Sequence, residues 1–376
     1  MANITLFGSG LVGAVIAQDL SSHHSVTVID KNKNSLQKFS FKKNITTVEA
    51  DATDKKVIER YCENADVVVT ALPGFIGFQV LKQIVELGKN VADISFYPEN
   101  ALELNELAQE KNCTVIVDCG VAPGMSNFFA GYYAHKMEVD EFICYVGGLP
   151  VERKFPFEYK APFSPVDVIE EYTRPARLKE NGKIVVKPAL SEIEYLNFDK
   201  VGTLEAFNTD GLRSLLYTLN IPNMKEKTLR YPRHTRLIQA FIETGFFENK
   251  EIEINGHKLK PIELTTKLLK DAWKLNEGDD ELTIMRIIIK GKENGKSQTY
   301  IYDLFDKYDK NTGFTSMSRT TGFTCTAMVN MILEKVFTQK GVFPPELLPT
   351  NDKIFNYVIN YLEKRNVVYK PSVISE

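Results

Sequence analysis

The first 120 residues alternate short runs rich in Val and Ile with amphipathic segments of helical spacing. Parallel strands need a crossover connection, usually a helix that covers one face of the sheet. The alternation therefore predicts an α/β fold that begins with a Rossmann doubly wound parallel sheet. Six strands are expected, at residues 4–7, 25–29, 45–49, 66–71, 90–94 and 114–118.

Three glycines follow the first predicted strand, Gly8, Gly10 and Gly13 in the sequence GSGLVG. In a strand–turn–helix of this spacing, the first glycine permits the tight turn, the second lets a pyrophosphate approach and the third lets the helix lie close to the sheet. The helix N-terminus adds free N–H groups and the positive end of a dipole. We predict that this turn, with Leu11 and Val12, binds a dinucleotide; a merely tight strand–helix joint is the alternative.

The second predicted strand ends in Asp30. A carboxylate about 20 residues after the glycines accepts hydrogen bonds from ribose hydroxyls and repels a 2′-phosphate, so NAD is the expected cofactor. Lys31 and Lys33 leave NADP as the alternative, and a turn cap is the other role open to Asp30. Because ligands lie at the carboxyl ends of such strands, the remaining cofactor-binding candidates are Asp51, Ala71, Leu72 and Pro73.

Two more aspartates, Asp93 and Asp118, end the fifth and sixth predicted strands. Each carboxylate should face the crevice of the sheet, where it can accept a proton from a reacting group. A cap on the following loop or helix is the alternative for each. The next segment, DCGVAPGMSN, predicts a turn that leads into a helix N-terminus and either binds an anion or simply restarts the chain.

The composition changes near residue 121, where glycine, proline and aromatic residues become frequent. Two strand-like runs, LTIMRIIIKG and SQTYIYDLF, are separated by KENGK, whose Asn-Gly pair suits a type I′ hairpin turn. They predict a second α+β domain that contains an antiparallel sheet. Residues 320–336 predict a helix of small side chains that folds back on the first domain. The expected division is 1–120 with 320–376, and 121–319.

Arginines of the second domain are candidates for holding a substrate, because a guanidinium binds a carboxylate through two parallel hydrogen bonds. We predict Arg213 and Arg230 as substrate ligands, together with Arg319 before the small-residue helix. A surface position is the alternative for each of them.

Three other residues have two interpretations each. His234 is a candidate proton carrier, and a structural histidine is the alternative. Gly147, in the sequence YVGGLP, would bring a bare strand end near a ligand, and a β-bulge is the alternative. Tyr159 is a candidate substrate contact, and packing among its aromatic neighbours explains it as well.

The charge balance and the cysteine content limit which partners and which kinds of site the chain is expected to have. The chain has 46 basic and 49 acidic residues without a basic patch, so neither nucleic acid nor a membrane surface is expected. Five cysteines without a CxxC pair or a histidine cluster argue against a metal site and a disulfide framework. No secretory signal and no apolar run of about 18 residues is evident, which predicts a cytoplasmic protein that acts on a small molecule.

Seven motifs occur in order along nearly the whole chain: GSGLVG, DCGVAPGMSN, YVGGLP, FEYKAPFSP, LEAFNTDGLRSL, TLRYPRH and GVFPPE. In this order the chain resembles the saccharopine dehydrogenase family, and most closely its compact lysine 6-dehydrogenases. VAPGMSN followed by YVGGLP is much more specific than the glycine spacing. The Asp-Gly-Leu-Arg core, with Asp210 and Arg213, departs from the lysine-deaminating pattern.

This resemblance implies a cofactor domain completed by the C-terminal segment and an inserted domain that carries substrate binding and the contacts of a homodimer. It implies oxidation at the ε-carbon of lysine, so NAD-dependent deamination of L-lysine with release of ammonia is the first expectation. A glutamate-forming saccharopine dehydrogenase or a related amine-coupling reductase is the alternative. A dinucleotide-binding sensor without enzymatic activity is the interpretation from a different class.

Overall fold

The computed structural model describes residues 1–40, 42–161, 165–276 and 278–375, and gives the backbone alone for residues 165–167. The chain divides into two compact units, each built from several segments. Unit 1 comprises Met1–Met137, Tyr217–Leu219 and Ser318–Val368; unit 2 comprises Glu138–Leu216, Asn220–Met317 and the segment from Tyr369 onward. Among the described helices, none is long and apolar enough to cross a lipid bilayer.

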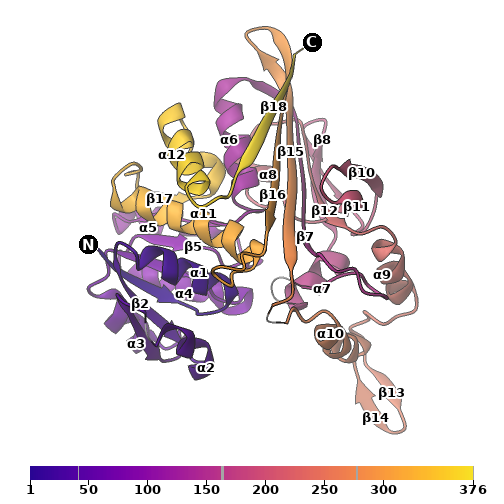
Figure 1. Ribbon diagram of the computed structural model, residues 1–376, viewed down its shortest axis with the longest axis horizontal. Helices are drawn as coiled ribbons and strands as arrows, with labels where there is room; N and C mark the ends of the chain where they lie inside the picture. Colours follow the sequence, from indigo (N-terminus) through magenta and orange to yellow (C-terminus); the bar gives the residue numbers. More distant parts are fainter. Residues whose placement is uncertain (41, 162–164, 277, 376) are drawn as a thin grey trace. The chain divides into compact units, whose positions relative to one another are not determined.

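Unit 1 is built around a seven-stranded parallel sheet with the strand order β17-β6-β5-β4-β1-β2-β3. Figure 1 labels β2, β5 and β17 of this sheet. Its strands are β1 (Asn3–Phe7), β2 (Ser25–Asp30), β3 (Ile45–Glu49), β4 (Val67–Thr70), β5 (Val91–Asp93), β6 (Thr114–Ile116) and β17 (Gly341–Phe343). Val67, Val68 and Val69 are fully buried, as expected of a parallel strand covered on both faces. The strand order reverses between β1 and β4, the point where ligands of doubly wound sheets bind.

Helices of unit 1 connect and cover these strands. They are α1 (Leu11–Leu20), α2 (Lys33–Leu36), η1 (Gln37–Phe39), α3 (Lys55–Cys62), α4 (Gly74–Glu86), η2 (Ala101–Leu104), α5 (Asn105–Glu110), α6 (Met125–Lys136), η3 (Pro345–Leu347), α12 (Asp352–Glu363) and most of α11 (Ser316–Leu333). The predicted small-residue helix is α11, and it packs on α1. A Cβ atom on its Gly322 would lie 2.9 Å from a methyl carbon of Val15, so the glycine permits this close approach.

Unit 2 contains a nine-stranded mixed sheet with the order β10-β11-β12-β7-β15-β16-β18, in which β8 pairs with β12 and β9 pairs with β8. Its strands are β7 (Glu138–Pro150), β8 (Ala176–Glu180), β9 (Lys183–Lys187), β10 (Glu194–Phe198), β11 (Gly202–Asn208), β12 (Asn223–Arg230), β15 (Glu281–Glu293), β16 (Lys296–Lys307) and β18 (Tyr369–Ser375). The long strands β15 and β16 form the predicted hairpin, and Asn294 and Gly295 have the positive φ values of a type I′ turn.

The rest of unit 2 packs on this sheet or extends from it. Its other elements are α7 (Pro165–Thr173), α9 (His234–Glu243), α10 (Pro261–Ala272) and the small hairpin of β13 (Ile252–Ile254) and β14 (His257–Leu259), while α8 (Leu215–Thr218) crosses a unit boundary. One core cluster gathers Tyr172, Phe207 and Trp273, and another gathers Ile143 and Leu229.

The structure differs from the sequence expectations in three places. The first sheet has a seventh strand, β17, which is only three residues long and follows most of unit 2 in the chain. The second sheet is not wholly antiparallel, because β7 and β12 pair in parallel. The compact units also differ from the expected boundaries: α6 belongs to unit 1, where Phe128 stacks on Phe355 of α12, and β18 pairs with β16 in unit 2.

Candidate functional site

The glycine turn between β1 and α1 has the geometry of a dinucleotide cradle. Gly8 has φ +103°, and a Cβ atom there would lie 2.2 Å from the carbonyl oxygen of Ala71. A Cβ atom on Gly13 would lie 2.3 Å from the carbonyl oxygen of Gly8. A Cβ atom on Gly10 would meet no described atom within 4 Å. Packing therefore explains Gly8 and Gly13, whereas the open space at Gly10 fits the approach of a ligand.

The N-terminus of α1 is left uncapped by side chains. Gly10 is the N-cap residue, and no side chain of the described residues caps this helix. Leu11 is 51% exposed beside this end. The first N–H groups of a helix have no intrahelical partner and carry the positive end of its dipole, so they suit a phosphate. The residues present thus fit the pyrophosphate of a dinucleotide.

Asp30 lies at the carboxyl end of β2 and binds the same turn. Its Oδ2 accepts hydrogen bonds from the Ser9 backbone N–H and hydroxyl, both at 2.7 Å, and its Oδ1 accepts one from the Asn32 N–H at 2.8 Å. A carboxylate has about four acceptor sites, so one remains for a ribose hydroxyl. Lys38 donates to the carbonyl oxygens of Ser9 and Gly10. Neither Ser9 nor Lys38 was predicted from the sequence, where only the serine inside GSG gives a signal.

The other predicted cofactor residues separate into two groups. Ala71 adjoins the glycine turn, and its N–H donates to the carbonyl oxygen of Phe7 at 2.8 Å. The Leu72 N–H donates to the Ser95 hydroxyl at 3.3 Å, and Pro73 is the N-cap residue of α4. Asp51 is exposed and accepts hydrogen bonds from the Thr53 N–H and hydroxyl, which lower its pKa. The β4 turn therefore borders the cradle, while Asp51 stabilises its own turn.

Asp93, at the end of β5, is fully buried. Its Oδ1 accepts hydrogen bonds from the Thr70 hydroxyl at 2.5 Å and the Ser95 N–H at 3.0 Å. Burial raises the pKa of Asp93 to about 6, although hydrogen bonds from Thr70, Ser95 and Tyr97 oppose the rise. This carboxyl group is held inside unit 1 by its neighbours.

Asp118 follows β6 and lies next to the end of β5, because the adjoining Cys119 N–H donates to the Asp93 carbonyl oxygen at 2.9 Å. Asp118 is 8% exposed and has φ +51°. Left-handed backbone at a residue other than glycine costs free energy and clusters at functional sites. The structure thus brings the two predicted catalytic aspartates together at one edge of the sheet, in different surroundings.

Two of the motifs that carry the family resemblance contact each other in unit 1. Asn127, in VAPGMSN, donates through Nδ2 to the Glu346 carboxylate, in GVFPPE, at 3.1 Å. Both side chains are buried, and the Thr218 hydroxyl donates to the same carboxylate at 2.6 Å. Gly131 permits this contact, because a Cβ atom there would lie 2.0 Å from the Glu346 carbonyl oxygen. These residues fasten α6 to η3.

His234 begins α9 and is 2% exposed. Its Nδ1 lies 3.0 Å from the Phe157 carbonyl oxygen and its Nε2 lies 3.0 Å from the Tyr172 hydroxyl. Burial, and after it the charge of Arg230, lowers the pKa of His234 to about 3. With both ring nitrogens engaged and the ring held neutral, His234 has the arrangement of a structural histidine, which does not support the predicted proton transfer.

Arg230 lies at the end of β12 and is also 2% exposed. Its guanidinium donates to the Glu171 carboxylate at 2.9 Å, the Tyr172 hydroxyl at 3.1 Å and the Tyr159 hydroxyl at 3.4 Å. The same guanidinium stacks on the Tyr159 ring, with 4.3 Å from Cζ to the ring centroid. These internal contacts occupy Arg230 and Tyr159, so the structure brings them together without supporting a direct substrate contact.

The remaining residues that were predicted to bind substrate lie in different environments. A Cβ atom on Gly147 would lie 2.6 Å from the Leu229 carbonyl oxygen, so this glycine permits the close pairing of β7 with β12. Arg319 lies on α11 in unit 1 and donates to the Arg365 carbonyl oxygen at 3.1 Å. Arg213 is half-buried and has φ +53°. Its positive charge acts on Glu226, a buried acid that was not predicted as a site residue.

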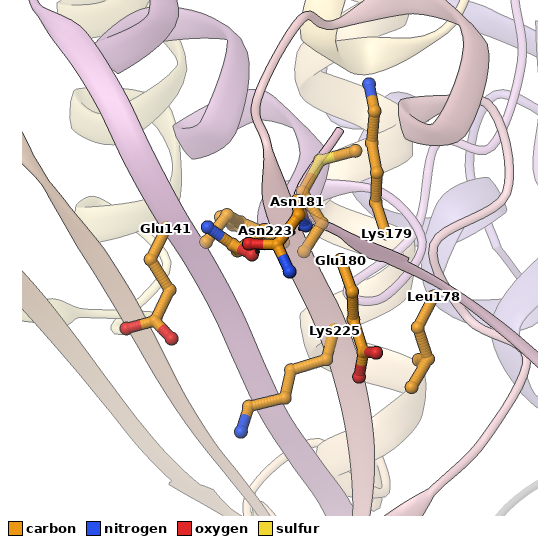
Figure 2. Close-up of a pocket in the computed structure, with 9 residues that line it drawn as sticks. Glu141, Leu178, Lys179, Glu180, Asn181, Asn223 and Lys225 are labelled. Carbon is orange, nitrogen blue, oxygen red and sulfur yellow. Dashed lines mark hydrogen bonds between the residues drawn. The ribbon is translucent and has the colours of Figure 1, made fainter. Parts of the chain in front are cut away.

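A pocket of about 240 Å³ lies elsewhere in unit 2. Figure 2 draws the residues that line it. It lies among β7, β8 and β12 and is lined by polar side chains that include Glu141, Asn181 and Lys225. None of the predicted site residues lines it. This pocket therefore gives no support to the candidate chemistry.

Both parts of the chain match known family models. Residues 4–116 match the model described as the saccharopine dehydrogenase NADP binding domain, and residues 120–368 match the saccharopine dehydrogenase C-terminal domain. The two matches together span nearly all of unit 1 and unit 2.

Individual relatives are similar at low identity. The chain is 22% identical to an NADP(+)-dependent, L-glutamate-forming saccharopine dehydrogenase of Schizosaccharomyces pombe, and the alignment covers both chains in full. Carboxyaminopropylagmatine dehydrogenase of Synechocystis is 23% identical over 92% of both chains. The mouse mitochondrial alpha-aminoadipic semialdehyde synthase is 25% identical over 66% of this chain, which spans only 28% of that protein. The apo saccharopine dehydrogenase structure of Saccharomyces cerevisiae has a TM-score of 0.83 over both full chains at 17% identity, which supports the same fold.

Proposed function

Because the chain belongs to the saccharopine dehydrogenase family, we propose that it oxidises the carbon–nitrogen bond at the ε-carbon of a lysine-derived amino acid, with a nicotinamide dinucleotide as hydride acceptor. The observation that carries this proposal is the glycine cradle: open space at Gly10 before an uncapped helix, bordered by Asp30. When bound, the nicotinamide ring would take up a hydride from the substrate carbon.

The chain's own residues would bind the cofactor and move one proton. The α1 N–H groups would hold the pyrophosphate, and Asp30 would accept a hydrogen bond from a ribose hydroxyl. A protonated alkylamine has a pKa of about 10.4, so it must lose a proton before its carbon can release a hydride. Asp118 is the proposed proton acceptor, since it is the less enclosed of the two aspartates. The resulting substrate imine takes up water and separates into an aldehyde and an amine.

Saccharopine is the substrate that the comparisons favour, because the fission-yeast relative covered in full bears that name and is L-glutamate-forming. Its secondary amine joins the ε-carbon of lysine to glutamate, so cleavage would release L-glutamate. L-Lysine is the second candidate, favoured by the motif resemblance to compact lysine 6-dehydrogenases. The homodimer inferred from the same resemblance is part of the proposal.

We propose NAD rather than NADP as the physiological cofactor, on the position of Asp30 at the end of β2. The fission-yeast relative is named as NADP(+)-dependent, and Lys38 lies against the same turn. A comparison of both cofactors is therefore built into the test.

The test is the appearance of reduced cofactor at 340 nm, at about pH 9–10 where more of the amine is unprotonated. Saccharopine and L-lysine are each assayed with NAD and with NADP, and Gly10→Ala serves as the control for cofactor-dependent turnover. We expect reduction of NAD by saccharopine, with glutamate detected as product. Turnover of lysine alone, with ammonia released, selects the second candidate. Cofactor binding without turnover of either amino acid would refute the proposal and favour a dinucleotide sensor.

A further inference from the structure

Glu226 is a buried acid in the middle of β12, and the side chains that the structure describes offer its carboxylate no hydrogen bond. It is 6% exposed, and among the described residues its carboxylate makes neither a hydrogen bond nor an ion pair. Buried carboxylates are ordinarily hydrogen-bonded or paired with a cation. A buried carboxyl group without a hydrogen bond destabilises the folded protein unless a ligand binds to it.

Gly211 makes room for this carboxylate. A Cβ atom on Gly211 would lie 1.5 Å from Glu226 Oε1 and 2.1 Å from its carboxyl carbon. Any larger side chain would therefore displace the acid. Arg213, two residues further on, has left-handed backbone and acts on Glu226 as the opposing positive charge. The segment Asp-Gly-Leu-Arg thus contributes a cation whose charge acts on the buried acid, and both residues belong to unit 2.

The other charged groups that face Glu226 are engaged elsewhere. Asp210 accepts two hydrogen bonds from the Arg177 guanidinium, at 2.9 and 2.8 Å. Glu171, on α7, binds Arg230 at 2.9 Å. Burial is the main reason that the pKa of Glu226 is raised to about 8, and the negative charges of Glu171 and Asp210 add to the rise. The positive charge of Arg213 opposes it. The free protein therefore holds Glu226 protonated at neutral pH, ready for an ammonium group to take the place of its proton.

We propose that Glu226 binds the α-ammonium group of the amino-acid substrate, beside an α-carboxylate held by Arg213. The inference rests on the proposed function and deepens it, since it assigns the selection of α-amino acids over simple amines to this pair. The two charged groups of an α-amino acid sit on one carbon atom, so their receptor needs an anion next to a cation. Arg213 and Glu226 supply that combination.

Binding has a defined proton balance. The neutral Glu226 carboxyl group gives its proton to solvent, and the resulting carboxylate pairs with the incoming ammonium group. The substrate keeps its own charge, no covalent bond of the substrate changes, and one proton is released for each substrate bound. An amine without an α-ammonium group would leave the proton on Glu226.

The experiment measures this proton by titration calorimetry at pH 7 in buffers of different protonation enthalpy. The full chain is saturated with NADH, so that saccharopine and L-lysine bind without being oxidised. 6-Aminohexanoate, which lacks the α-ammonium group, is the comparison ligand. For the wild type we expect release of about one proton with the amino acid and none with 6-aminohexanoate.

Three variants test the assignment. Glu226→Gln should weaken amino-acid binding by at least about 30-fold and abolish the proton release, with 6-aminohexanoate binding unchanged. Glu226→Asp keeps a carboxylate and should restore the proton release at intermediate affinity. Glu141→Gln, on neighbouring β7 where Glu141 pairs with Lys290 at 2.6 Å, is the matched control and should behave as the wild type.

Two outcomes overturn the inference in different ways. If the wild type oxidises an amino acid but Glu226→Gln retains its affinity or its proton release, the role of Glu226 is wrong and the proposed function stands. If the wild type oxidises a simple diamine such as cadaverine and neither amino acid, the proposed function is wrong and the inference fails with it.

Discussion

At the scale of single residues, the two strand-end aspartates show how surroundings divide similar side chains. Asp93 is fully buried and accepts hydrogen bonds from Thr70 and Ser95. Asp118 is slightly exposed, and its backbone has a left-handed conformation. Their positions at strand ends followed from the sequence, because each ends an apolar run. Their difference did not, because it depends on residues from neighbouring strands.

We predict that Asp118→Asn lowers kcat by at least about 100-fold, because asparagine keeps the size of the side chain but cannot accept a proton. The measurement is kcat and KM for the amino-acid substrate across pH 6 to 10. KM should change little. An Asp118→Asn enzyme with wild-type kcat throughout this range would contradict the role of Asp118.

Asp93→Asn is the comparison variant, with a different expected result. The folded state holds the Asp93 proton up to about pH 6, whereas the ordinary pKa is 3.8. The stability of the wild type relative to Asp93→Asn should therefore fall as the pH rises from about 4 to 6, by at most about 3 kcal/mol. Urea unfolding at several pH values measures this difference. A constant difference would show that Asp93 titrates alike in both states.

At the scale of elements, α9 shows a helix start that its own sequence does not explain. Its N-cap residue, Arg233, has φ +85° and provides no side-chain cap. The missing acceptor comes from β11: Glu205 accepts hydrogen bonds from the Arg233 N–H at 2.9 Å, the Thr235 N–H at 2.5 Å and the Thr235 hydroxyl at 2.6 Å. A strand therefore caps the helix that carries His234.

Glu205→Gln should destabilise unit 2 by about 1–3 kcal/mol, because the buried cap loses its charge and one of its acceptors. The control is Glu59→Gln, which removes an exposed ion pair with Lys55 at 3.9 Å and should cost less than about 0.5 kcal/mol. Urea unfolding of both variants gives the comparison. Equal stability of the two would refute the capping role.

At the scale of the whole molecule, the chain passes between its two units several times. Unit 1 is completed only by β17 and the helices α11 and α12, which follow most of unit 2 in sequence. Neither unit is a contiguous stretch of chain. This arrangement favours one cooperative unfolding transition rather than two independent ones.

Cofactor binding should therefore stabilise the entire chain. At about 100 times its Kd, NAD adds roughly 2.7 kcal/mol, which corresponds to about 3–4 °C in Tm for a chain of this size. Differential scanning calorimetry should show a single peak that shifts as a whole. Gly10→Ala should fold with wild-type stability, because its Cβ atom has open space, but show no shift with NAD. Two peaks of which NAD moves only one would contradict the prediction.

Local patterns in the sequence determined much of unit 1, namely the alternation of strands and helices and the glycine turn. In unit 2 they determined the Asn-Gly hairpin. These features depend on residues close together in the chain, so periodicity and turn chemistry reveal them. The family resemblance added an expected chemistry, and the matches to both family models confirm the family itself.

Only the tertiary structure decided which of the polar residues are already satisfied. The sequence made His234, Arg230 and Tyr159 candidates, and in unit 2 Arg230 donates to the Tyr159 hydroxyl while Arg230 and His234 both contact the Tyr172 hydroxyl. Glu226, in the unremarkable run NMKEKTLR, is a buried acid that accepts no hydrogen bond from the described side chains. Whether a charged side chain is free or engaged depends on contacts between segments far apart in sequence, and no local pattern in one chain encodes them.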